Sequence, residues 1–151
     1  MKVPDVFLPE KSLDEQIKRL ESEEKEEKEP RKLSEFVLDE RQYTTSKIED
    51  ATYERLYQKI NRADIADGIF VSYGVGENIV PFLDILKFQD AQTMRKNISN
   101  MVIAARRYND WSSTIKAYIM VKGQYSCFAY AEDREFINAY IEKFGFKEIY
   151  Q

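Results

Sequence analysis

Residues 79–150 read IVPFLDILKFQDAQTMRKNISNMVIAARRYNDWSSTIKAYIMVKGQYSCFAYAEDREFINAYIEKFGFKEIY. Short runs rich in β-branched and aromatic residues alternate here with two longer runs of helical period, in the order strand, helix, strand, strand, helix, strand. This order (βαββαβ) predicts a ferredoxin-like split βαβ unit, an α+β sandwich with both helices on one face of the sheet. The other face of such a sheet must be covered by the chain or bind something.

The first helix of this unit is expected over residues 90–108. Asp90 is a favourable N-cap residue, and apolar side chains then recur at steps of three and four. The apolar face consists of Met94, Ile98, Met101, Val102 and Ala105. The opposite side carries Arg95, Lys96, Arg106 and Arg107, with Ile103 among them. Together with Lys122 these cations are candidate phosphate contacts, although a solvated outer helix face explains them more simply.

The second half of the unit is predicted to be a β-hairpin, a helix and a closing strand. The expected ranges are 114–121 and 124–130 for the hairpin, 132–144 for the helix and 146–150 for the strand. Lys122 and Gly123 form the hairpin turn. Gly145 follows the helix where a glycine C-cap belongs.

Alternation along the hairpin strands assigns their side chains to two faces. The more apolar set is expected under the helices. The open face is then expected to carry Tyr118, Met120, Tyr125 and Cys127. Such a patch is too apolar to stay bare, so three coverings are considered. The chain itself can cover it with a helix predicted over 47–64, a second copy can pair sheet against sheet, or the face can bind a ligand.

One local pattern favours a ligand face. Residues 122–130, KGQYSCFAY, resemble the basic–Gly–aromatic strand signature of RNA-recognition-motif domains with one inserted residue, and the following EDRE resembles their helix start. This resemblance implies base stacking on an open sheet face. The middle aromatic of the signature is Cys127 here, and residues 79–88 do not match the first-strand motif of the family.

The C-terminal residues carry a second resemblance. Residues 140–150, YIEKFGFKEIY, resemble the C-terminal helix–Gly-Phe–strand of GNAT acetyltransferases. That family also needs a loop of the Arg/Gln-x-x-Gly-x-Gly/Ala kind for the cofactor pyrophosphate, and no such segment occurs in this chain. A glycine C-cap between a helix and a strand explains the same letters, so no cofactor is expected.

The N-terminal third is predicted to be a charged arm over residues 1–45, followed by a single α+β domain over 46–151. Residues 1–50 contain 10 basic and 15 acidic side chains, net −5, within a chain of net charge −4. Ser12 opens a short helix whose narrow apolar stripe is Leu13, Ile17 and Leu20. This stripe either docks on the body or binds a partner. The helix at 47–64 and a strand at 69–73 are expected to precede the split βαβ unit.

Composition excludes several kinds of site. The chain has no histidine and one cysteine, which removes the commonest general base, ordinary zinc sites and an internal disulfide. The carboxylates nearest to predicted strand ends are Glu77, Asp84, Asp90 and Glu132, and no metal site is assigned to them. No apolar run approaches the roughly 18 residues that span a bilayer, and no signal peptide is recognised, so a cytoplasmic protein without a membrane segment is expected.

These observations favour a small non-catalytic binding or adaptor module that acts through protein–protein association, with Leu13, Ile17 and Leu20 as the docking element. One alternative is single-stranded nucleic acid binding, RNA above all, on the open sheet face. Another is an enzyme with carboxylate- or metal-dependent chemistry, for which no catalytic residue is assigned. A protein partner is expected, with a homodimer and nucleic acid as alternatives.

Overall fold

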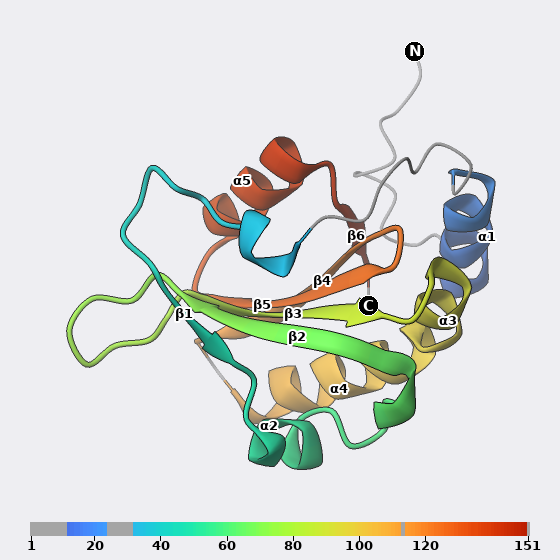
Figure 1. Cartoon of the computed structure of the whole chain (residues 1–151), viewed down its shortest axis with the longest axis horizontal. Helices are drawn as coiled ribbons and strands as arrows, with labels where there is room; N and C mark the ends of the chain where they lie inside the picture. Colours follow the sequence, from blue (N-terminus) through green and yellow to red (C-terminus); the bar gives the residue numbers. More distant parts are fainter. Residues whose placement is uncertain (1–11, 24–31, 113, 151) are drawn as a thin grey trace.

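A computed structural model describes residues 12–23, 32–112 and 114–150 of the chain, which form a six-stranded antiparallel sheet with helices on both faces (Figure 1). The strand order is β1-β2-β3-β5-β4-β6. The strands are β1 (Thr44–Lys47), β2 (Ile65–Ser72), β3 (Phe82–Phe88), β4 (Lys116–Lys122), β5 (Tyr125–Ala131) and β6 (Lys147–Ile149). The helices are α1 (Leu13–Glu23), α2 (Asp50–Arg55), α3 (Ala91–Lys96), α4 (Ile98–Trp111) and α5 (Arg134–Phe144), with 3₁₀ turns at Leu33–Glu35 (η3) and Arg62–Asp64 (η4). The predicted α+β class is confirmed.

The sheet separates two apolar cores. All seven residues of β5 are buried, because this strand lies between β3 and β4 and has a packed layer on each side. Alternation assigns the hairpin side chains as predicted: Ile119 and Phe128 face α4, whereas Met120 and Cys127 face α5. The period-two pattern therefore placed the side chains of β4 and β5 on the correct faces.

The two long helices lie on opposite faces of the sheet, α5 on one side and α4 on the other (Figure 1). The prediction that both share one face, as in a ferredoxin-like unit, is therefore wrong. A ferredoxin-like unit pairs its last strand with its first, which here would be β6 with β3, but β2 pairs along the outer edge of β3 and occupies that position. β6 pairs instead with the outer edge of β4.

The hand of the crossovers explains why α5 then changes face. The connection from β3 to β4 and the connection from β5 to β6 step in the same direction across the sheet. The two connections start from strands that run in opposite directions, because β3 and β5 are antiparallel. Two such crossovers have the same hand only if their helices lie on opposite faces, and the right-handed form is strongly preferred.

The α5 face is also covered by residues 33–38, whose apolar side chains lie in the same core. The Phe36 ring lies 5.0 Å from Tyr125 and 5.5 Å from Phe144, measured between ring centroids. The hydroxyls of Tyr73 and Tyr140 are 2.6 Å apart, and Tyr140 donates to the carbonyl of Phe36 at 3.0 Å. The chain thus covers this face itself, although with a different segment from the helix expected over 47–64.

The segment 47–64 lies on the α4 face and forms a shorter helix than expected. Lys47 belongs to β1, where it pairs with Ile69 of β2, and helix α2 starts only at Asp50. The N-cap residue is Glu49, and its side chain makes no capping hydrogen bond. The sequence has a capping-box spacing at Ser46 and Glu49, and strand pairing to β2 prevails over it.

Local helix signals elsewhere are confirmed. The Asp90 carboxylate accepts the Thr93 N–H at 2.7 Å, and Gly145 ends α5 with φ of 73°. The helix expected over 90–108 is divided into α3 and α4 at the buried Asn97. The Asn97 amide donates to the Asp64 carboxylate at 3.0 Å, which ties this junction to η4.

The N-terminal helix α1 packs on the body. Its stripe Leu13, Ile17 and Leu20 is half-buried against the α4-side core. The Gln16 side chain donates to the Tyr150 carbonyl at 3.3 Å and accepts the Tyr150 N–H at 3.0 Å, so one amide satisfies both backbone groups next to β6. The expected boundary at residue 45 falls inside β1, and residues 33–38 belong to the core. Among the described residues, no helix has the length and apolar character to cross a membrane.

Replacing Gln16 by alanine is expected to loosen α1, because the Tyr150 N–H and C=O lose their partner. We expect the free energy of unfolding to fall by about 1 kcal/mol and the Tyr150 amide to exchange its hydrogen faster. Urea denaturation and NMR-detected exchange measure the two effects. Lys18→Ala, on the exposed side of the same helix, is the matched control. Equal exchange in both variants would contradict the docking of α1.

Candidate functional site

The face predicted to be open is covered in the structure. Met120, Tyr125 and Cys127 are at most 1% exposed, beneath α5 and residues 33–38. Tyr118 is half-buried, and the Arg134 guanidinium lies 5.6 Å from its ring centroid. Base stacking on these side chains would require the whole covering layer to leave, so this face offers no ligand surface in the folded chain.

The five cations predicted as phosphate contacts do not form one patch. Lys122 donates to the Phe144 carbonyl at 2.9 Å and so caps the end of α5. Lys96 lies in the last turn of α3 with Arg95, whereas Arg106 lies in α4. Arg106 lies eight residues beyond the start of α4, a rise of about 12 Å, whereas Arg95 and Lys96 precede that start, so the two pairs are far apart.

The exposed side of α4 brings together apolar, aromatic and charged side chains. We define the α4 outer face as Ile103, Arg106, Arg107, Asp110 and Trp111, all of which are exposed. Ile103, Arg107 and Trp111 follow one another at steps of four residues and therefore lie along one row of the helix surface. Ile103 is 42% exposed and Trp111 is 81% exposed.

Trp111 is the site residue that the sequence reasoning missed. The predicted helix ended at residue 108, whereas α4 continues to Trp111. Extending the helical period by one turn would have aligned Trp111 with Ile103 and Arg107. The helical spacing was present in the sequence, but the predicted helix end at residue 108 left Trp111 outside it.

The charges of the α4 outer face have no partners within the ranges that the structure describes. No ion pair or hydrogen bond there engages the side chains of Arg106, Arg107 or Asp110. Other surface cations are paired, as in the bond of 2.6 Å between Arg134 and Glu148. The guanidinium groups on α4 thus remain available to a partner.

A line of aromatic rings connects Trp111 to the interior. The Trp111 ring contacts Tyr108 edge to face at a centroid distance of 5.8 Å, and Tyr108 contacts Tyr130 in the same way at 4.8 Å. Tyr130 in turn stacks on Phe82 at 4.5 Å. The exposed indole is therefore connected to the buried core through a series of ring contacts.

Beneath α4 lies a buried hydrogen-bonded cluster of Tyr57, Asp84 and Tyr130. The Tyr57 hydroxyl donates to the Asp84 carboxylate at 2.5 Å and lies 2.6 Å from the Tyr130 hydroxyl. Burial raises the pKa of Asp84 to about 6, and the hydrogen bond from Tyr57 opposes this rise. Burial also raises the pKa of the Tyr57 hydroxyl well above its ordinary value.

A carboxylate with a pKa near 6 is chemically suited to act as a general base. Asp84 is only 2% exposed, however, and it lines neither of the two clefts described below. The hydroxyl of Ser126, buried on the same face of the sheet, has no hydrogen-bond partner among the described residues. We interpret the cluster as a polar part of the core that holds the segment after α2 to the sheet.

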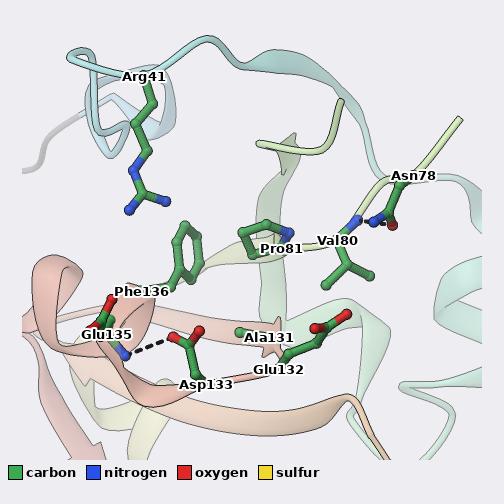
Figure 2. Close-up of a pocket in the computed structure, with 9 residues that line it drawn as sticks. All are labelled: Arg41, Asn78, Val80, Pro81, Ala131, Glu132, Asp133, Glu135 and Phe136. Carbon is green, nitrogen blue, oxygen red and sulfur yellow. Dashed lines mark hydrogen bonds between the residues drawn. The ribbon is translucent and has the colours of Figure 1, made fainter. Parts of the chain in front are cut away.

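The cleft in Figure 2 has a volume of about 270 Å³ and lies at the start of α5. Arg41 projects from one side, with its guanidinium 5.8 Å from the Phe136 ring centroid, and Glu132 and Glu135 lie on the other side. The Asp133 carboxylate accepts the Glu135 N–H at 3.0 Å as the helix N-cap. The polar groups of this cleft thus include part of an ordinary helix start.

A second cleft, of about 400 Å³, lies between α2 and β2. Arg62 stacks over the Tyr53 ring at 3.6 Å and donates to Asp50 at 3.1 Å, so its charge is already engaged. The carboxylates predicted near strand ends do not converge. Asp90 caps α3, and within the described ranges no three potential ligands lie together as a metal site.

The raised pKa of Asp84 gives a stability prediction with a definite sign. The native chain holds this proton more tightly than the unfolded chain, whose ordinary pKa is 3.8. The contribution of Asp84 to the free energy of unfolding therefore falls as the pH rises from about 4 to about 6. Relative to the parent chain, Asp84→Asn is expected to gain about 2 kcal/mol between pH 4 and pH 7.

Urea denaturation of both chains across this range measures the difference. Glu54→Gln, an exposed change on α2, serves as the control and should follow the parent chain at every pH. A difference between Asp84→Asn and the parent chain that does not change with pH would contradict the raised pKa of Asp84.

Comparison with protein-family models finds no match for this chain, and comparison with curated proteins and with solved structures finds none either. No relative therefore assigns a function to any residue of the fold. The exposed side chains of the described residues are the basis for a functional proposal.

Proposed function

We propose that this chain is a non-catalytic association module that binds a protein partner through the α4 outer face. The observation that carries the proposal is Trp111, the single tryptophan of the chain, held in solvent at 81% exposure. Tryptophan and arginine are the residues most enriched among those that dominate binding energy at protein interfaces. On α4, Arg107 and Trp111 share one row of the helix surface with Ile103.

The helix below this surface is rigidly fixed. Met101, Val102 and Ala105 are buried on its inner side. Near its end, the Asn109 amide donates to the Ala117 carbonyl at 3.1 Å and accepts the Ala117 N–H at 2.7 Å, which fastens α4 to β4. A preorganised surface loses little conformational entropy on binding, so its exposed side chains retain more of their interaction energy.

The arm expected from the sequence is less suited to docking than α4. Leu13, Ile17 and Leu20 contact the core of the protein, so α1 would have to leave the body before these side chains could meet a partner. The α4 outer face needs no such release. A reducing cytoplasm fits the single buried thiol of Cys127 and is the compartment that we propose.

Nucleic acid is a weaker candidate for the same surface. Arg106 and Arg107 suit phosphates, but Ile103 has no counterpart on a phosphate backbone. The net charge of −4 also disfavours a general polyanion binder. These features favour a protein surface with both apolar and charged groups.

The test is site-specific photo-crosslinking in the native cell. A photoreactive phenylalanine analogue at position 103 should join the full chain to one discrete protein species. Trp111→Ala should reduce the yield at least about tenfold, since hot-spot tryptophans contribute about 2 kcal/mol or more. The same analogue at position 54, on exposed α2, is the control and should give no such product.

Circular dichroism and urea denaturation verify that Trp111→Ala leaves the fold intact, as expected for so exposed a side chain. If position 103 gives no product, or if Trp111→Ala leaves the yield unchanged, the α4 outer face is not the binding surface.

A further inference from the structure

We infer that the partner segment on the α4 outer face is an acidic amphipathic helix, with carboxylates midway between two apolar side chains. This inference rests on the proposed function and names the chemistry of its partner. It follows from the charge at the centre of the surface and from the spacing of its ends.

The centre of the surface is cationic. Arg107 stands four residues from Ile103 and four residues from Trp111, and Arg106 lies beside it. A partner that covers both apolar ends removes these guanidinium groups from water. An unpaired buried charge costs several kcal/mol, so the partner must present acceptors of opposite charge at that position. Carboxylates pair with guanidinium groups through two parallel hydrogen bonds and fit this requirement best.

The ends of the surface match a helix. Eight residues separate Ile103 from Trp111, which corresponds to a rise of about 12 Å along α4. A second helix packed along this row presents apolar side chains at its own positions i and i+7, and the residues at i+3 and i+4 lie between them on the same side. Glutamate or aspartate at these two middle positions would face Arg107 and Arg106.

A second copy of the chain is a poor occupant. A two-fold pairing that packs Ile103 of one copy on Trp111 of the other places the midpoint, Arg107, opposite the Arg107 of the other copy. Like charges would then meet at the centre of the interface, which is destabilising. The surface is thus complementary to a different chain and not to itself.

The body already accepts one amphipathic helix with an excess of acidic residues, although the positions midway between Leu13 and Leu20 are Gln16 and Ile17 and not carboxylates. α1 contains Asp14, Glu15, Glu21 and Glu23 against Lys18 and Arg19, and its narrow apolar stripe packs beside α3. The α3–α4 side of the protein is therefore compatible with an acidic amphipathic helix. The α4 outer face offers a second, vacant place for one.

The experiment uses Trp111 as its own reporter in the full chain. The probe is a synthetic helical peptide with a Leu-x-x-Glu-Glu-x-x-Leu core, and its matched counterpart carries glutamine at both glutamate positions. The glutamate peptide should shift the Trp111 emission to shorter wavelength at a concentration about tenfold lower than the glutamine peptide. Equal effects of the two peptides, or no shift with either, would overturn the inference.

Charge substitutions in the protein test whether the partner segment is acidic. Arg107→Glu should abolish the preference for the glutamate peptide, and Asp110→Lys should strengthen it several-fold. Lys59→Glu, an exposed change beyond α2, is the matched control and should leave the preference unchanged. Weaker binding of the glutamate peptide by Asp110→Lys would show that the partner is not acidic.

Two further measurements test whether nucleic acid or a second copy of the chain binds the α4 outer face. An emission shift with an oligothymidylate single strand at moderate salt would overturn the inference in favour of nucleic acid. A concentration-dependent dimer in sedimentation, lost in Trp111→Ala, would overturn it in favour of a second copy. If neither peptide shifts the emission but the crosslink from position 103 persists, the inference of an acidic helix is wrong and the proposed function stands. If the crosslink from position 103 is absent, the proposed function itself is wrong.

Discussion

The hand of its two crossovers is the constraint on which this structure depends. Because β2 occupies the outer edge of β3, the last strand joins the sheet beside β4, and a right-handed connection through α5 must then pass over the opposite face from α4. The sheet consequently acquires two cores, and β5 is buried on both sides. The face that an open sandwich would have offered to a ligand is closed by the chain, and the sheet is covered on both sides.

Local signals in the sequence were sufficient for the elements that depend on neighbouring residues. The Asp90 cap, the glycine at the end of α5 and the alternation along β4 and β5 all follow from short-range geometry. The errors concern long-range pairing. The pattern at Ser46 and Glu49 favours a helix start, but pairing of β1 with β2 prevails there. The strand expected over 69–73 directly precedes the split βαβ unit, yet its pairing along the outer edge of β3, and the exposure of Trp111, needed the tertiary arrangement.

The two edges of the sheet are closed in different ways. β1 is short, fully exposed and polar, and its Lys47 makes the edge a poor template for another strand. At the other edge, the Gln16 amide occupies the backbone groups of Tyr150 as a neighbouring strand would. Pairing through strand edges is thereby discouraged on both sides, which leaves side-chain contacts on a helix surface as the favoured route to association.

The one thiol and the one indole of the chain lie on opposite sides of the same sheet. Cys127 is buried under α5, and its burial raises the pKa of the thiol well above the ordinary value, whereas Trp111 lies at the surface of the other layer. A disulfide reagent can reach Cys127 only after the α5 layer has opened, so its reaction rate reports the opening of that layer, whether local or as part of global unfolding. Each half of the protein thus contains its own natural spectroscopic or chemical label, and the cooperativity between the two cores can be measured without adding one.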